Sequence, residues 1–204
     1  MQVTRKLQSK LDASVNWVFD NGVEARYVQR SADYFIVYLS SHTGCNKACR
    51  FCHLTQTGQT SFQPVTLEEY KQQAEVVLSR YDELLSQGLP VASRVNFNFM
   101  SRGEPLANPV VLENLVKLEN VLGELAAKRN LAFNLKISSI IPAKAINRGL
   151  DAVFHKTKCS QLYYSLCSVD SKFRKRWLPK AANVEVVMEQ IRELQDLDPM
   201  FSVV

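Results

Sequence analysis

Three of the chain's five cysteines lie close together, with the spacing Cys45-x₃-Cys49-x₂-Cys52. A disulfide is a poor explanation, because it would leave one of the three thiols unpaired. Structural zinc usually takes four ligands, and the chain offers no second Cys-x₂-Cys pair. His42 or His53 could supply a fourth ligand, so zinc stays an alternative.

An iron–sulfur cluster accounts for the three thiols better than zinc does. Cysteine thiolates are the usual ligands of such clusters, and a compact loop can wrap one corner of a four-iron cluster. Three thiolates would hold three irons and leave the fourth iron open for a ligand that is not protein. The same logic leaves an open position on catalytic zinc. The loop is therefore predicted to hold a catalytic 4Fe-4S cluster.

A second signal is a basic segment in which five cations surround Phe173 and Trp177. Such a mixture can contact phosphates and stack on a base, although a solvated helix face with two aromatic anchors is the plainer interpretation. The net charge of +5 and the pI near 9.0 permit a nucleic-acid partner without establishing one. The candidate RNA-binding residues are Lys172, Arg174, Lys175, Arg176 and Lys180.

These residues must be positioned by an alternation of strands and helices that begins near residue 34. Strands are expected over residues 34–39, 94–100, 131–138 and 161–167, with the start of another at 201–204. Helices are expected over residues 66–86, 108–129 and 184–194, with shorter ones after Pro142 and after residue 167. Such alternation predicts an α/β fold with a parallel sheet and outer helices, as a barrel or an open part of one.

The candidate residues cluster at one edge of this expected sheet. The cysteine loop, Gly103-Glu104-Pro105, Ser138-Ser139 and Ser165-Leu166-Cys167 all follow expected strands. In parallel α/β folds the chemistry gathers at the carboxyl ends of the strands. We therefore expect these four segments to share one site.

The chain divides into an expected core over residues 33–204 and an extension over residues 1–32. The extension is expected to contain a short basic helix and a hairpin that turns at Asp20-Asn21-Gly22. No apolar run approaches the length of a membrane span, and the first residues lack the pattern of a signal peptide. A cytoplasmic location without a membrane partner is the expectation.

The Cys-x₃-Cys-x₂-Cys motif after the first strand of a βα alternation resembles the radical SAM superfamily. Phe51 before the last cysteine is common in that superfamily, and Gly103-Glu104-Pro105 one strand later is similar to its second motif. The resemblance implies S-adenosylmethionine as cofactor, chelated to the open iron through its amino and carboxylate groups. It also implies that Glu104 accepts charge-assisted hydrogen bonds from the cofactor's ammonium group.

Four stretches resemble the RlmN/Cfr family, radical SAM enzymes that methylate adenine in ribosomal or transfer RNA. They are residues 39–45 (LSSHTGC), 99–106 (FMSRGEPL), 137–143 (ISSIIPA) and 164–179 (YSLCSVDSKFR…LP). By this resemblance, Cys45, Cys49 and Cys52 hold the cluster. The cofactor would be lined by Gly103, Glu104, Ser138, Ser165, Leu166 and Cys167.

Several positions depart from the family pattern. Tyr38 stands where the family keeps the cysteine that resolves its covalent adduct, Lys136 replaces a serine, and Cys167 replaces a histidine. Cys167 is better explained as a small residue that fits than as a substitute nucleophile. The family's methyl-carrying cysteine, a cofactor-contacting asparagine and a small N-terminal RNA-binding domain have no counterpart in the sequence, so no catalytic residue is assigned.

These departures lead to a hypothesis about the chain and its function. We expect a truncated or divergent family member whose barrel lacks its last strands and is completed by a second polypeptide or by self-association. The leading function is a radical SAM enzyme acting on adenine in rRNA or tRNA, with an electron donor such as flavodoxin or ferredoxin. The alternatives are a radical SAM enzyme of other outcome or substrate, and a catalytically silent RNA-binding relative.

Overall fold

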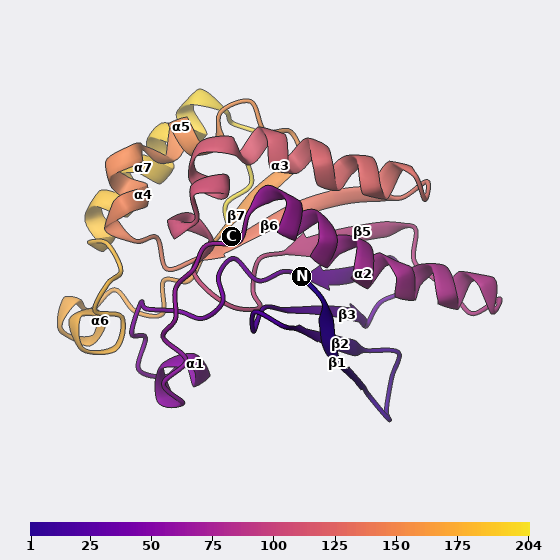
Figure 1. Ribbon diagram of the computed structural model, residues 1–204. Coiled ribbons are helices and arrows are strands. Elements are labelled where there is room, and N and C mark those ends of the chain that lie inside the picture. Colours follow the sequence, from indigo (N-terminus) through magenta and orange to yellow (C-terminus); the bar gives the residue numbers. More distant parts are fainter.

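The computed structural model describes residues 1–204 and builds them around one seven-stranded sheet (Figure 1). The strands are β1 (Val3–Gln8), β2 (Val15–Phe19), β3 (Glu24–Gln29), β4 (Tyr34–Tyr38), β5 (Arg94–Asn98), β6 (Ala132–Ser139) and β7 (Ser160–Tyr164). The α-helices are α1 (His53–Gln56), α2 (Leu67–Ser86), α3 (Pro109–Ala127), α4 (Ala143–Arg148), α5 (Leu150–Phe154), α6 (Ser171–Trp177) and α7 (Val184–Leu197). The expected α/β class is confirmed, and the strands lie across the sheet in chain order.

The N-terminal part of the sheet is antiparallel and corrects one expectation. Residues 3–8 form strand β1, which pairs with β2, so the expected basic helix is wrong. Thr4 and Val3 are β-branched and favour extended backbone, and Arg5 and Lys6 suit an exposed edge strand. The expected hairpin between β2 and β3 is observed, and β3 pairs with β4 across the proposed boundary at residues 32 and 33.

The strands β4, β5, β6 and β7 pair in parallel, as the alternation predicts. The helix α2 begins at a capping box, in which Thr66 accepts from the Glu69 backbone and the Glu69 side chain bonds back to Thr66. Asn108 caps α3, and Pro109 occupies the first turn of that helix. β7 ends at Tyr164 instead of residue 167, so Ser165–Cys167 lie in the loop that follows.

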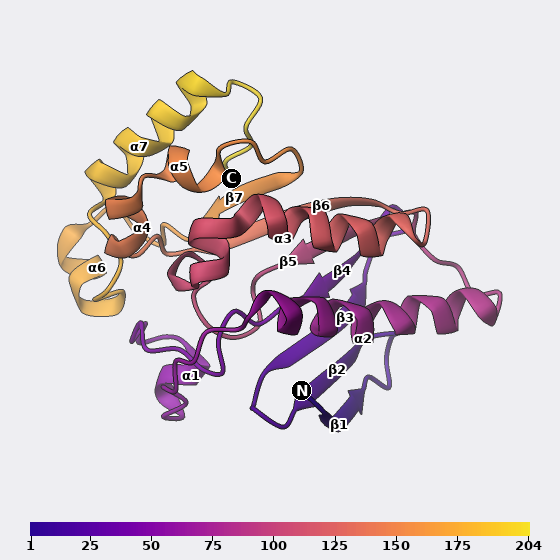
Figure 2. The same cartoon turned by 45° about the horizontal axis from the view of Figure 1, so that its top comes forward.

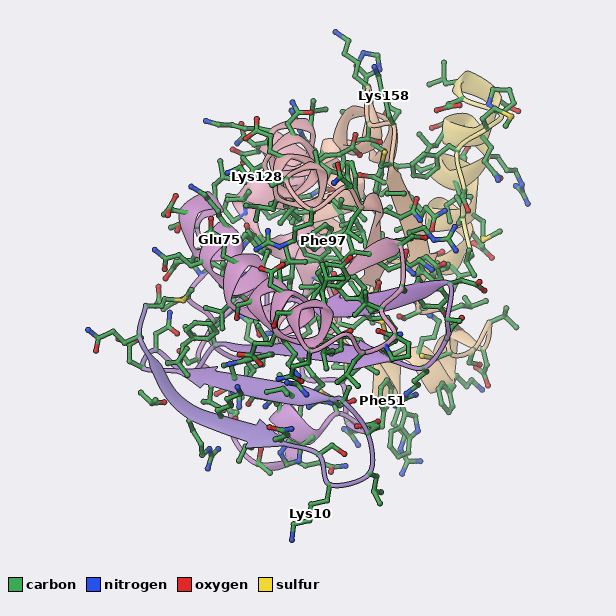
Figure 3. All side chains as sticks on the ribbon, turned by 90° about the vertical axis from the view of Figure 1, so that its right-hand side faces the viewer. Lys10, Phe51, Glu75, Phe97, Lys128 and Lys158 are labelled. Carbon is green, nitrogen blue, oxygen red and sulfur yellow. The ribbon has the colours of Figure 1, made fainter.

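The two faces of the sheet differ in what covers them. Helices α2 and α3 lie along one face, as Figure 2 shows. Alternate strand residues point into the core between the sheet and these helices, among them the fully buried Phe97 and Leu135. Figure 3 shows Phe97 inside the molecule, with Glu75 and Lys128 on the outside of the helix layer. The opposite face, here called the helix-free face, carries mostly polar side chains.

The last residues support the expectation of another strand. Val203 forms a parallel bridge with Leu162, and the backbone N–H of Tyr164 donates to the carbonyl of Val204 at 2.8 Å. The sheet is open, because β1 and β7 are not paired with each other. None of the helices is both long and apolar enough to span a membrane.

Candidate functional site

A cavity of about 790 Å³ opens at the carboxyl ends of β4, β5 and β6. It brings together all but one of the residues expected for cluster and cofactor. The expected residues in its lining are Cys45, Cys49, Cys52, Gly103, Glu104, Ser138, Ser165 and Cys167. Tyr38, at the position of the family's resolving cysteine, lines it as well, whereas Leu166 does not. The shared site expected from the strand ends therefore exists.

The cysteine loop is held in place by its backbone. The Cys45 N–H donates to the Gln59 carbonyl at 3.1 Å, and the Cys52 N–H donates to the Cys49 carbonyl at 3.0 Å. A Cβ atom at Gly44 would lie 2.5 Å from the carbonyl oxygens of Gln59 and Ser61, so only glycine fits there. Ala48 adopts a left-handed φ of 58°, a strained conformation that is concentrated at functional loops.

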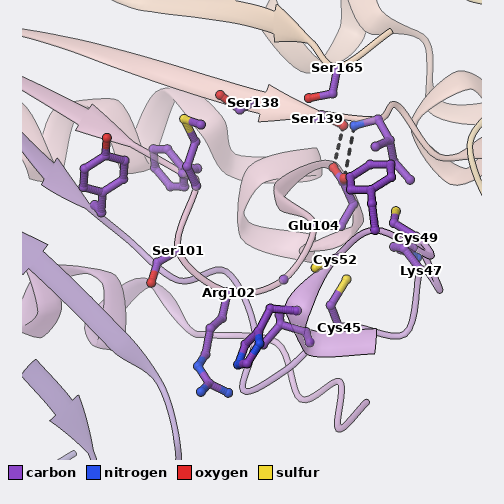
Figure 4. A pocket seen from close by; sticks show the side chains of 18 of the residues that line it. Cys45, Lys47, Cys49, Cys52, Ser101, Arg102, Glu104, Ser138, Ser139 and Ser165 are labelled. Carbon is purple, nitrogen blue, oxygen red and sulfur yellow. Dashed lines mark hydrogen bonds between the residues drawn. The ribbon is translucent and has the colours of Figure 1, made fainter. Parts of the chain in front are cut away.

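The three thiols lie in one cavity, but they are not gathered into a metal-binding group. All three are free, and Figure 4 shows them together below Glu104. No group of three His, Cys, Asp or Glu side chains is arranged to hold one ion, which disfavours a zinc site with His42 or His53. Each thiolate of a four-iron cluster binds a different iron, so the thiols need not converge on one point. The chemical type of the donors, three cysteine thiols, therefore matches that of a cluster, although they are not gathered into a metal-binding group.

Burial and repulsion between neighbouring thiols disfavour the charged form of Cys45 and Cys49. The pKa of Cys49 is raised to about 12, mainly by burial and to a smaller extent by the neighbouring Cys45 and Cys52. Burial also raises the pKa of Cys45. Thiols that resist losing a proton in the free protein become thiolates when positive metal charge compensates for burial.

Glu104 is the central carboxylate of the cavity. It is 5% exposed, and its Oε1 accepts from the Ser139 hydroxyl at 2.5 Å and from the Leu106 N–H at 3.1 Å. Its Oε2 accepts the Ile140 N–H at 3.2 Å, which leaves one acceptor position of this oxygen for a ligand. Burial raises the pKa of Glu104 to about 7. Glu104 was predicted from the sequence, but Ser139 was passed over in favour of Ser138.

Gly103 and the adjoining histidine shape the wall beside Glu104. Gly103 has a φ of 93°, and a Cβ there would lie 2.5 Å from Ser41 Oγ and 2.6 Å from His42 Nδ1. His42 is buried and stacks on Phe62 with 3.8 Å between the ring centroids. Burial lowers the pKa of His42 to about 4. His42 therefore packs the wall as a neutral ring.

The basic segment divides into one buried and several exposed cations. Arg174 is 5% exposed, and its guanidinium donates to the carbonyls of Leu166 and Ala182. Its assignment as an RNA contact is corrected, because the charge holds the loop after β7 in place. Lys172, Lys175 and Arg176 are exposed on α6, where Phe173 stacks on Trp177.

Helix α6 also contacts the cysteine loop directly. Lys180 Nζ donates to the Asn46 carbonyl at 2.7 Å, and the Arg50 N–H donates to the Trp177 carbonyl at 2.9 Å. Figures 1 and 2 both show α6 beside the segment that carries α1. The helix that carries the exposed cations therefore lies beside the cysteine loop.

Two charged groups of the cavity were not recognised in the sequence. Lys47, inside the cysteine loop, lines the cavity and lies 4.7 Å above the Phe62 ring. Arg102 forms an ion pair with Glu24 at 2.6 Å, which joins the cavity wall to β3. A lysine between two cysteines is a signal that could have been used, whereas the Arg102–Glu24 pair depends on the tertiary fold.

Comparison with known proteins points to one family. The chain is 26% identical over 211 residues to the dual-specificity RNA methyltransferase RlmN of Aliarcobacter butzleri, covering 94% of this chain and 54% of that protein. It is 28% identical over 165 residues to RlmN of Helicobacter hepaticus, covering 76% of this chain and 38% of the relative. The resemblance to the RlmN family is confirmed.

The similarity to RlmN is distant and partial. RlmN of Helicobacter pylori is 26% identical over 161 residues, which cover 78% of this chain and 40% of that protein. The chain thus spans about half, or less, of the length of these RlmN relatives. No family model matches the chain.

Proposed function

We propose that this chain forms the cluster- and cofactor-binding part of a radical SAM enzyme of RlmN type, with a fold derived from the radical SAM barrel, acting on adenine in RNA. One observation carries the proposal: three free thiols with Cys-x₃-Cys-x₂-Cys spacing share a cavity with the buried Glu104. Cys45, Cys49 and Cys52 would hold a 4Fe-4S cluster. When bound and reduced, that cluster supplies the electron that cleaves S-adenosylmethionine to a 5′-deoxyadenosyl radical.

The chain's own residues would bind and orient the cofactor. Glu104 would accept the cofactor's ammonium at its remaining Oε2 position, and Ser139 and Ile140 hold the carboxylate in place. Lys47 would place positive charge among the thiolates. Gly103, Ser138 and Ser165 would line the cofactor, and Cys167 lies with them. Leu166 would act indirectly, because its carbonyl accepts from Arg174 and so holds the loop that carries Ser165 and Cys167.

RNA is the proposed substrate, and the exposed α6 cations Lys172, Lys175 and Arg176 are its proposed phosphate contacts. Lys180, already bonded to the cysteine loop, would connect the RNA contact to the cluster. Binding would then weaken as salt rises. A small electron donor such as flavodoxin or ferredoxin, in a reducing cytoplasm, completes this proposal.

A second candidate keeps the radical chemistry but not the methyl transfer. The half-buried Tyr38 lines the cavity where the family's resolving cysteine would stand. A phenol cannot resolve a covalent adduct by thiol chemistry, so a different reaction outcome fits this residue.

Anaerobic reconstitution followed by product analysis tests both candidates. The protein should turn brown and retain about four irons per chain. With dithionite and S-adenosylmethionine it should release 5′-deoxyadenosine. A methylated adenine in added RNA favours the RlmN-type reaction, and 5′-deoxyadenosine without methylation favours the second candidate. A colourless protein that binds zinc would contradict both.

A further inference from the structure

The helix-free face of the sheet carries a row of polar residues that begins at the cavity and continues beyond its lining. The register places Tyr38, Asn98, Lys136 and Gln161 in one row across β4, β5, β6 and β7. Leu135 and Ile137, the neighbours of Lys136 in β6, are fully buried in the core. Because side chains alternate along a strand, Lys136 points to the helix-free face. Tyr38, the first residue of this row, also lines the cavity, so the row is continuous with the candidate site.

Lys136 is held by two aromatic rings and by no carboxylate. Its Nζ lies 5.2 Å from the centroid of the Tyr163 ring and 5.8 Å from that of the Tyr34 ring. None of the four ion pairs of the structure includes it. The rings stabilise the ammonium without neutralising it, so its three N–H donors remain available to an anion.

Asn98, opposite Lys136 in the sheet, is 8% exposed and its Oδ1 has no hydrogen-bond partner. Its Nδ2 meets only the sulfur of Met100, at 3.9 Å, and a thioether is a weak acceptor. A buried amide without a good partner is uncommon and calls for an explanation. Met100 is 57% exposed, so a shift of its side chain toward solvent would free the Asn98 Nδ2 that it contacts.

The charges of this face suit an anionic ligand. Arg26 and Arg94 are exposed on the same face as Lys136, from β3 and β5. The nearby Glu24 is already neutralised by Arg102, with an N–O distance of 2.6 Å. A ligand approaching the row therefore meets cations, amides and tyrosine rings.

We propose that Lys136 and Asn98 form a ribose–phosphate subsite that holds a nucleotide of the RNA beside the cavity. The Lys136 ammonium and the Asn98 amide N–H bind a phosphate oxygen, and Asn98 Oδ1 accepts from the ribose 2′-hydroxyl. An acceptor for the 2′-hydroxyl is what separates RNA from DNA. The choice of RNA as ligand rests on the proposed function, whereas the anion site rests on the residues themselves.

Fluorescence anisotropy with labelled oligo(A) RNA and oligo(dA) DNA tests the subsite in the full chain. Lys136→Met keeps the aliphatic stem between the tyrosines and removes the charge. It should weaken RNA binding about tenfold and reduce the slope of log affinity against log salt by about 0.7. Lys128→Met on the helix layer (Figure 3) is the matched control and should change neither quantity.

Asn98→Leu tests the amide separately. The substitution removes a polar group that has no good partner, so the fold should survive, as thermal unfolding will show. The wild type should bind RNA more tightly than DNA, and N98L should bring the two affinities together. An unchanged RNA preference in N98L would overturn the assignment of the 2′-hydroxyl acceptor.

Other outcomes overturn the subsite or separate it from the proposed function. Equal RNA affinity and salt slope in K136M and wild type would overturn it, as would absence of RNA binding by the wild type. Weaker binding of radiolabelled S-adenosylmethionine by K136M with unchanged RNA binding would assign the anion to the cofactor's carboxylate and also overturn it. If cofactor cleavage fails while K136M still weakens RNA binding, only the catalytic proposal is lost.

Discussion

Two buried carboxylates lie at opposite edges of the parallel sheet and have different surroundings. Glu104 and Glu119 are each 5% exposed, and each accepts three hydrogen bonds. Glu119, on α3, accepts from Lys158 N–H, Cys159 N–H and the Ser160 hydroxyl, and so ties that helix to the start of β7. Glu104, at the carboxyl edge, lines the cavity with the three thiols.

The comparison shows that burial and hydrogen bonding alone do not identify a functional carboxylate. Both glutamates are held rigidly by neighbouring donors, as any buried charge must be. The two glutamates differ in the edge of the sheet at which they lie and in the reactive side chains around them. Glu119 has one cysteine neighbour, Cys159, at the amino edge of the sheet, whereas Glu104 shares its cavity with the three clustered cysteines, among them Cys49, at the carboxyl edge.

The largest expected effect distinguishes these two cysteines. Cys49→Ser should lower iron retention and 5′-deoxyadenosine formation by roughly 100-fold or more, since loss of even the groups that orient metal ligands costs 10–100-fold. Cys159→Ser, at the other edge, should leave both unchanged. The measurements are iron content and product yield after anaerobic reconstitution. An equal loss of iron and product in both variants would contradict the claim that Cys49, and not Cys159, is a cluster ligand.

The next expected effect is a loss of stability on replacing Glu119, the carboxylate at the amino edge of the sheet. Glu119→Ala leaves two backbone N–H groups and a hydroxyl without their acceptor, and it should lower the free energy of unfolding by about 3 kcal/mol. Cofactor cleavage by the folded fraction should not change. Urea titration gives the stability. A variant as stable as the wild type would show that Glu119 does not hold α3 to β7.

Gly103→Ala should cost about 2 kcal/mol, because its Cβ would clash with Ser41 and His42 in a left-handed backbone. Gly88→Ala is the matched control, since Gly88 also has a positive φ but no atom lies within 4 Å of its Cβ position. The control should cost about 1 kcal/mol. Equal losses of stability would mean that the wall beside Glu104 yields to the added methyl group.

The smallest effect is a pH dependence of stability. The pKa of Glu104 is raised from 4.5 to about 7 in the folded chain, chiefly by burial. The folded state therefore keeps a proton that the unfolded state loses, so this stabilising contribution is full below pH 4.5 and is lost as the pH rises through 7. Urea unfolding at pH 5 and pH 8 should show a larger decline for the wild type than for Glu104→Gln. Parallel declines would contradict the raised pKa.

Local chemistry made much of the fold predictable. The Thr66–Glu69 capping box and the Asn108-Pro109 pair specify two helix starts through contacts within a few residues, and both were found as expected. Strand β1 was missed because the two β-branched residues Val3 and Thr4 are a weak signal on their own, and pairing with β2 is what makes the segment extended. A short segment that mixes basic and apolar residues does not show from its own sequence which strand it will pair with.

The site was predictable to the level of its motifs but not of individual contacts. Cys45 follows from the spacing of the cysteines and Glu104 from the resemblance of Gly103-Glu104-Pro105 to a family motif. The choice between Ser138 and Ser139 depends on which face of β6 each side chain takes. A shift of one residue reverses that face. Arg174 was misassigned because a run of cations does not show which one points inward.

The central claim is that the cavity of Glu104 and the three thiols binds and cleaves S-adenosylmethionine. The most direct test is the yield of 5′-deoxyadenosine from reconstituted, dithionite-reduced wild type and Glu104→Gln, at equal iron content and subsaturating cofactor. The account predicts product from the wild type and roughly tenfold less from E104Q, through loss of the charge-assisted contact to the ammonium. No product from an iron-loaded wild type, or equal product from both proteins, would contradict it.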